Sequence, residues 1–132
     1  MSISERYARV LDRVARAAQS AGRAPEDVTL VAVSKTWPAD VLKDAAGAGV
    51  EVFGENRAQE LKEKFAVLGD RVRWHFVGPL QSNKVRNVVG VAELVHSVDR
   101  YGLGEAIARR ARSLGIVQDV LVEVNTGGEA TK

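Results

Sequence analysis

The sequence contains no cysteine among its 132 residues, which excludes disulfide bonds and thiolate metal sites. Its charges nearly cancel, with 19 Lys and Arg against 17 Asp and Glu, so it lacks the basic excess typical of nucleic-acid binding. No apolar run approaches the roughly 18 residues of a membrane-spanning helix. The first residues also lack the apolar core and small-residue cleavage site of a signal peptide. We therefore expect a cytoplasmic protein that binds neither nucleic acid nor a membrane.

The composition is that of an ordinary globular domain. Apolar residues make up 45% of the chain and charged residues 27%, close to the average of soluble proteins. A chain of this length forms one hydrophobic core rather than two. We therefore expect a single domain over residues 1–132.

Helical and strand patterns alternate along the chain. An amphipathic helix is expected over residues 3–21, and the stretch 28–33 is almost continuously apolar. Such a short apolar run predicts a strand buried on both faces of a parallel sheet. Further strands are expected at 50–53, 72–77, 93–97 and 120–124, and helical segments between them at 39–48, 57–68, 83–89 and 99–114.

Five strands separated by helices predict an α/β fold with a parallel sheet. Two architectures remain open: a doubly wound open sheet and a (β/α)8 barrel. A complete barrel needs about 250 residues, and the last predicted strand here has no helix after it. If the fold is a barrel, we expect about five of its eight strands, in a chain truncated at its C-terminus.

Polar segments follow all five predicted strands. In a parallel fold the ligand site gathers at these carboxyl ends, so they are the best candidates for a functional site. The segments are 34–36, 54–57, 78–84, 97–100 and 125–129.

Lys35 is the strongest single candidate for a functional residue, because it directly follows the first apolar strand. An apolar setting disfavours the ammonium form and favours the free amine, which is what Schiff-base formation with an aldehyde requires. The alternative is a lysine whose ammonium group simply reaches solvent at the rim.

Each of the other candidate residues has a purely structural explanation as well as a functional one. Glu55 and Asn56 either lie near Lys35 or cap the helix that follows them. The segment containing Asn83 is suited to an anion but is also a plain turn. His75 and His96 each lack a second ligand at metal spacing, so we predict packed histidines and no metal site.

The strand-end segments resemble, in order, those of the pyridoxal 5'-phosphate (PLP) homeostasis proteins, single-domain relatives of the alanine racemase N-terminal barrel. The resemblance covers almost the whole chain. It is carried by the stretches 30–36, 53–60, 74–84, 96–99 and 124–132, of which 74–84 is the longest and most distinctive.

The resemblance implies a partial (β/α)8 barrel, the N-terminal portion of an alanine racemase-like domain. It implies that Lys35 holds PLP as an aldimine (Schiff base) and that Asn56 lies beside the cofactor ring. Three further residues are implied near the mouth: Asn83, Asn125 and Lys132.

By the same resemblance, the expected role is PLP homeostasis without catalytic turnover, with PLP-dependent apoenzymes as possible recipients of the cofactor. Two alternatives stay open. One is a PLP-dependent amino-acid racemase or decarboxylase that uses the same lysine. The other is an interaction module, without a cofactor, formed by a partial barrel.

Overall fold

The computed structural model describes residues 1–128 and residue 130. Helices and strands alternate as predicted. The elements are α1 (Ile3–Ser20), η1 (Pro25–Asp27), β1 (Ala32–Val33), α2 (Ala39–Gly47), β2 (Val52–Glu55), α3 (Ala58–Leu68), η2 (Gly69–Arg71), β3 (Arg73–Phe76), η3 (Ser82–Asn87), β4 (Leu94–Val98), α4 (Tyr101–Leu114) and β5 (Asp119–Val122).

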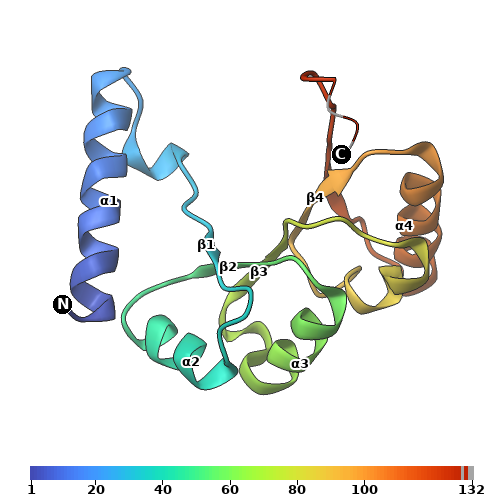
Figure 1. Cartoon of the computed structure of the whole chain (residues 1–132), viewed down its shortest axis with the longest axis horizontal. Coiled ribbons are helices and arrows are strands. Elements are labelled where there is room, and N and C mark those ends of the chain that lie inside the picture. The colour runs from blue at the N-terminus through green and yellow to red at the C-terminus, as the bar shows by residue number, and fades with distance from the viewer. Residues whose placement is uncertain (129, 131–132) are drawn as a thin grey trace.

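The strands form one parallel sheet in the order β1-β2-β3-β4-β5. Strands that are adjacent in the sheet are also consecutive in the sequence. Each helical connection therefore leads to the adjacent strand, as in a (β/α)8 barrel. The sheet is open, and the fold is a partial barrel. Helices α2 and α3 lie on the outer side of the sheet, while α1 and residues 123–128 after β5 rise as two separate arms (Figure 1).

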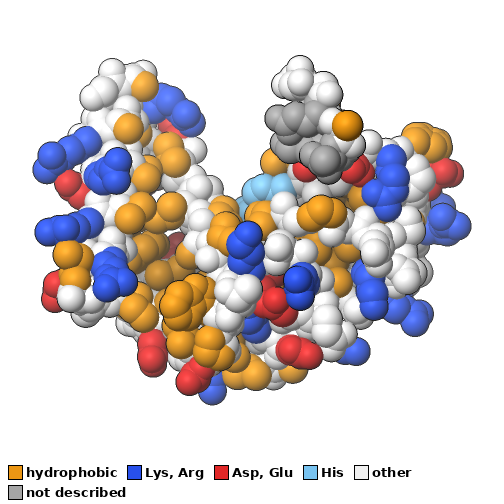
Figure 2. Space-filling view, viewed as in Figure 1, with side chains coloured by type: hydrophobic (Ala, Val, Ile, Leu, Met, Phe, Trp, Pro, Cys, Tyr) orange, Lys and Arg blue, Asp and Glu red, His pale blue; other side chains and the backbone are white. Residues whose placement is uncertain are grey.

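The core lies between the sheet and its covering helices. Phe53 of β2 and Trp74 of β3 are paired in register, are almost fully buried, and have ring centroids 5.9 Å apart. Leu61 of α3 packs in the same cluster. Since side chains alternate across a strand, the residues next to Phe53 and Trp74 face the opposite, inner side of the sheet. That inner side is the floor of the hollow between the two arms (Figure 2).

The prediction of a first strand buried on both faces is wrong. Strand β1 has only two residues, and the Val33 side chain is 52% exposed. At the other end of the sheet every residue of β5 is exposed. Both are edge strands with one neighbouring strand each, and neither is buried on both faces.

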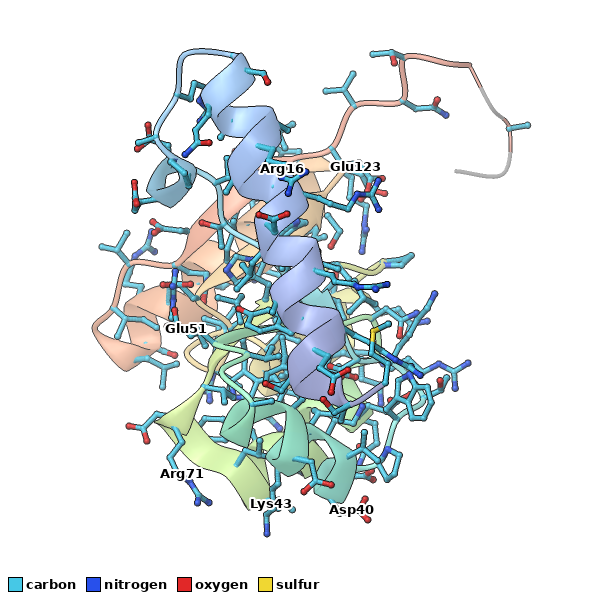
Figure 3. The ribbon with its side chains drawn as sticks, turned by 90° about the vertical axis from the view of Figure 1, so that its left-hand side faces the viewer. Arg16, Asp40, Lys43, Glu51, Arg71 and Glu123 are labelled. Atoms are coloured by element: carbon cyan, nitrogen blue, oxygen red, sulfur yellow. The ribbon has the colours of Figure 1, made fainter. Side chains whose placement is uncertain are left out.

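Helix α1 stands apart at one side of the molecule (Figure 1), and it crosses in front of the other elements when seen from that side (Figure 3). Ser2 caps it, with its Oγ accepting a hydrogen bond from the Glu5 amide at 3.1 Å. Its apolar stripe is only partly covered, since Ala18 is its one buried residue and Ile3 stays exposed. No helix within the described residues is long and apolar enough to cross a membrane.

Candidate functional site

Lys35 lies in a tight turn at the carboxyl end of β1. The amide of Trp37 donates to the carbonyl of Ser34 at 3.2 Å, which closes the turn. Thr36 has a φ of 69°, and no other non-glycine residue in the described chain has a positive φ. This conformation costs a residue with a Cβ roughly 1–2 kcal/mol, and such strain concentrates at functional sites. Lys35 itself is exposed, so the partly desolvated amine expected from the apolar strand is not found.

A buried network of charged side chains lies directly behind this turn. The Glu55 carboxylate has no exposed surface, and Lys64 is 5% exposed. Lys64 Nζ lies 2.9 Å from Glu55 Oε2 and donates to the Ser34 carbonyl oxygen at 2.9 Å. The Ser34 hydroxyl donates to the same Glu55 oxygen. Glu55 therefore makes its contacts directly behind the Lys35 turn. The alternative that it caps α3 is wrong, since that helix has no side-chain cap.

Glu60 holds the other side of the same turn. Its Oε2 accepts a hydrogen bond from the Thr36 amide at 3.0 Å and lies 3.1 Å from Lys64 Nζ. The bond from the Thr36 amide is the main cause that lowers the pKa of the Glu60 carboxyl, and Lys64 adds to it. Glu60 and Lys64 were missed by the sequence analysis, although both belong to α3 at i, i+4 spacing and Lys64 falls on the apolar face of that helix.

Asn56, which the family resemblance places beside the cofactor ring, directly follows β2, the strand that pairs with β1. Its Oδ1 is buried and has no hydrogen-bond partner among the described residues. Gly78, at the end of the next strand, presses against it: a Cβ built on Gly78 would come within 2.5 Å of the Asn56 Cβ and carbonyl oxygen. The close approach of the Gly78 backbone thus constrains the Asn56 backbone and Cβ, while the buried Oδ1 stays without a partner among the described residues.

His75 and His96 form a pair, which corrects the prediction of two isolated histidines. His75 Nδ1 lies 2.9 Å from His96 Nε2, and His75 Nε2 lies 3.0 Å from Glu93 Oε2. Because a carboxylate only accepts, His75 Nε2 carries a proton, and in a neutral His75 the Nδ1 atom accepts from His96 Nε2. The two histidines, the only ones in the chain, form the pale-blue floor of the hollow (Figure 2).

The surroundings lower the pKa values of Glu93 and His96. A hydrogen bond from Arg73 is the main cause that lowers the pKa of Glu93, and His75 contributes. Burial, followed by the nearby His75, lowers the pKa of His96 below its ordinary 6.5. At neutral pH the chain therefore holds a neutral His96 and an ionised Glu93. Within the described residues no group of three or more His, Asp or Glu is arranged to hold a metal ion.

A pH dependence of stability follows from His96. Because its folded pKa lies below 6.5, the unfolded chain takes up this proton first as the pH falls, and unfolding is then favoured. Stability should be fully present above pH 6.5 and decline below it, before the carboxylates titrate. Urea unfolding across about pH 8 to pH 4 measures this. His96→Gln, which keeps a donor but does not titrate, should remove the upper part of the decline; an unchanged profile would refute the assignment.

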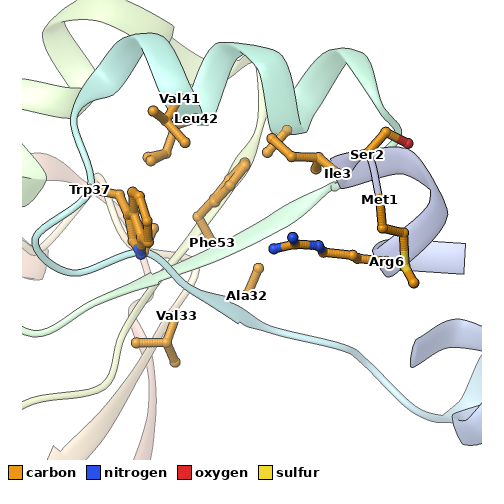
Figure 4. A pocket seen from close by; sticks show the side chains of 12 residues that line it. Met1, Ser2, Ile3, Arg6, Ala32, Val33, Trp37, Val41, Leu42 and Phe53 are labelled. Atoms are coloured by element: carbon orange, nitrogen blue, oxygen red, sulfur yellow. The ribbon is translucent and has the colours of Figure 1, made fainter. Parts of the chain in front are cut away.

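A cavity of about 570 Å³ adjoins the turn on the helix side of β1. Its lining is mostly apolar and comes from the start of α1, from β1 and from α2, with Trp37 on one wall and the Arg6 guanidinium reaching across (Figure 4). Ser34 belongs to this lining, but Lys35 does not. The candidate site is therefore the turn and the inner face of the sheet, not this cavity.

No protein-family model matches the chain, but named relatives match it along its whole length. The chain is 46% identical over 133 residues to the pyridoxal phosphate homeostasis protein of Aquifex aeolicus, covering 100% of this chain and 58% of the relative. It is 44% identical to that of Pseudomonas aeruginosa, covering 99% of this chain and 57% of the relative. The chain is related to the pyridoxal phosphate homeostasis proteins. It spans a little more than half the length of these curated relatives.

A solved structure of the same kind supports the fold. PipY of Synechococcus elongatus, determined with PLP bound, superposes with a TM-score of 0.82 at 37% identity, covering 98% of this chain and 57% of PipY. The resemblance to the pyridoxal phosphate homeostasis proteins, drawn from the strand-end segments, is thereby confirmed, as is the partial α/β barrel.

Of the three other residues assigned from this family, the structure describes two. Asn83 is exposed in η3 and lines a separate groove between η3 and α4. Asn125 follows β5 on the C-terminal arm and is exposed. Lys132 lies outside the described residues. Lys35 and Asn56 thus follow the neighbouring strands β1 and β2. The roles given to Lys35, Asn56, Asn83, Asn125 and Lys132 all stay predictions.

Proposed function

We propose that this chain binds PLP covalently through Lys35 and acts in PLP homeostasis as a carrier of the cofactor rather than as an enzyme. The observation that carries the proposal is the strained turn that exposes Lys35. The buried ion pair of Lys64 and Glu55 supports this turn. The names of the relatives and the PLP bound to PipY supply the identity of the ligand.

The residues present suit the cofactor. The exposed Lys35 amine can reach an aldehyde, and their condensation forms a C=N bond, breaks the C=O bond and releases water. After the neighbouring strand β2, the buried Oδ1 of Asn56 is an acceptor without a partner among the described residues. A polar ligand that supplies a donor there would satisfy it. These two groups give a covalent anchor and an orienting contact.

The groups around the turn favour binding over turnover. PLP enzymes need an acid or base positioned at the substrate carbon. Glu55 is fully buried on the helix side of the sheet, and Glu60 is engaged with both Lys64 and the Thr36 amide. One oxygen of each carboxylate, Oε2 in both cases, is therefore occupied in supporting the turn. A Schiff base that exchanges with other amines suits a carrier that supplies PLP-dependent apoenzymes.

Reduction with borohydride in the presence of PLP tests the assignment, because it fixes the Schiff base for peptide mapping by mass spectrometry. We expect Lys35 to be modified about tenfold more than each exposed lysine, a preference of about 1.4 kcal/mol. The variant Lys35→Ala should lose this preferred site, whereas Lys43→Ala, on the exposed face of α2, should keep it. Modification spread evenly over the lysines would refute the proposal.

The enzyme alternative makes a different prediction. A racemase or decarboxylase would turn over at least one amino acid in the presence of PLP, and Lys35→Ala would abolish that activity. We expect no turnover across a broad panel of amino acids. We also expect PLP loaded on the chain to activate an added apoenzyme, which a catalytic role alone does not require.

A further inference from the structure

The turn around Lys35 is held by side chains on both sides of that residue. On the preceding side, the Ser34 carbonyl accepts from Lys64 Nζ at 2.9 Å. On the following side, the Thr36 amide donates to Glu60 Oε2 at 3.0 Å. Lys64 and Glu60 are themselves in contact at 3.1 Å, so α3 closes a ring of contacts around the backbone of Lys35.

The stability of the fold does not by itself explain this ring of contacts. Lys64 and Glu55 are almost completely buried charges, and a buried ion pair is often no more stable than an apolar pair of similar volume. The ring also maintains Thr36 at a positive φ, which favours glycine. The side chains of Glu55, Glu60 and Lys64 thus maintain a buried ion pair and a backbone with a positive φ. Both are unfavourable, and both lie directly beside Lys35.

We propose that Glu60 and Lys64 are positioning residues that fix the Ser34–Thr36 backbone and thereby direct the Lys35 amine towards the ligand. Neither touches the ligand; each acts through the turn. The contribution of Glu60 can be tested by itself, because its side chain is less buried than that of Lys64. The inference rests on the proposed role of Lys35.

The experiment compares borohydride-trapped PLP at Lys35 in the full chain and in three variants. Glu60→Ala removes the acceptor of the Thr36 amide, and we expect the ratio of label on Lys35 to label on Lys43 to fall about tenfold, as for loss of a hydrogen bond to a charged group. Glu60→Gln retains a carbonyl oxygen for that amide and should restore most of the ratio. Glu63→Ala is the matched control on the same helix: Glu63 is exposed and contacts Gln59, so the ratio should not change.

Two further measurements separate positioning from general folding. Hydrogen exchange at the Thr36 amide should accelerate in Glu60→Ala, while the urea midpoint of this variant stays near that of Glu63→Ala. The visible absorbance of the PLP Schiff base should fall in parallel with the Lys35 label. A structural role without positioning would lower the midpoint and leave the Lys35 to Lys43 ratio unchanged.

The outcomes distinguish this inference from the proposed function. If the unmodified chain shows no preference for Lys35, the proposed function fails, and the positioning role fails with it. If the unmodified chain prefers Lys35 and Glu60→Ala retains that preference, the positioning role alone is overturned. Equal losses in Glu60→Ala and Glu63→Ala would also overturn it, because the effect would then belong to the charge of α3 and not to the Thr36 contact.

Discussion

Replacing Lys64 with methionine is expected to lower the free energy of unfolding by about 3–5 kcal/mol, the usual effect of removing one partner of a buried ion pair. Lys64 is 5% exposed, and Glu55, its partner at 2.9 Å, is completely buried. Without the ammonium, Glu55 keeps a desolvated charge and the Ser34 carbonyl loses its side-chain donor. Since domains have only about 5–15 kcal/mol of stability, urea unfolding should show a large shift or outright loss of the folded state.

Two controls attribute the effect to the buried pair. Lys62→Met removes the same charge from the exposed side of α3 and should change stability by no more than about 0.5 kcal/mol. The double variant Lys64→Met with Glu55→Leu removes both charges, and it should recover most of the loss because apolar replacements of buried pairs are often neutral. If Lys64→Met is no more harmful than Lys62→Met, Glu55 and Lys64 do not form the buried pair described above.

The order of elements and the parallel sheet could be predicted from the sequence because both depend on local signals. Apolar runs and helical spacing recur along the chain, and glycines end the helices, as Gly115 does after α4 with its positive φ. Burial of each strand could not be predicted in the same way. The run 28–33 has the composition of a central strand, but its burial depends on neighbours in the sheet, and β1 has only one.

The site was predictable only where residues follow strands directly. Lys35 and Asn56 could be proposed as candidates because polar residues at strand ends meet at one edge of a parallel sheet. Lys64 was missed because a charge within the apolar stripe of α3 resembles a solvent-reaching lysine until Glu55 is placed opposite it. The contact between His75 and His96 was missed because the two lie 21 residues apart, and only strand pairing brings them together.

Gly78→Ala is the second change for which we expect a large effect. A Cβ at this position would lie 2.5 Å from the Asn56 Cβ and carbonyl oxygen and 2.7 Å from its Cα. Two of these three atoms belong to the backbone, so rotation of a side chain does not relieve the overlap. We expect a loss of about 2–3 kcal/mol in urea unfolding, typical of overpacking in a tight site. Because Asn56 must move, the preference of PLP for Lys35 should fall as well.

Gly102→Ala is the matched control, and its expected effect has the opposite sign. Gly102 lies in α4, and a Cβ there would meet nothing within 4 Å. Alanine in place of glycine stabilises a helix by about 1 kcal/mol, so this variant should unfold at higher urea and label at Lys35 as before. If both variants were equally stable, the close approach of Gly78 to Asn56 would be wrong. If Gly78→Ala were destabilised yet labelled normally at Lys35, Asn56 would support the fold without orienting the ligand.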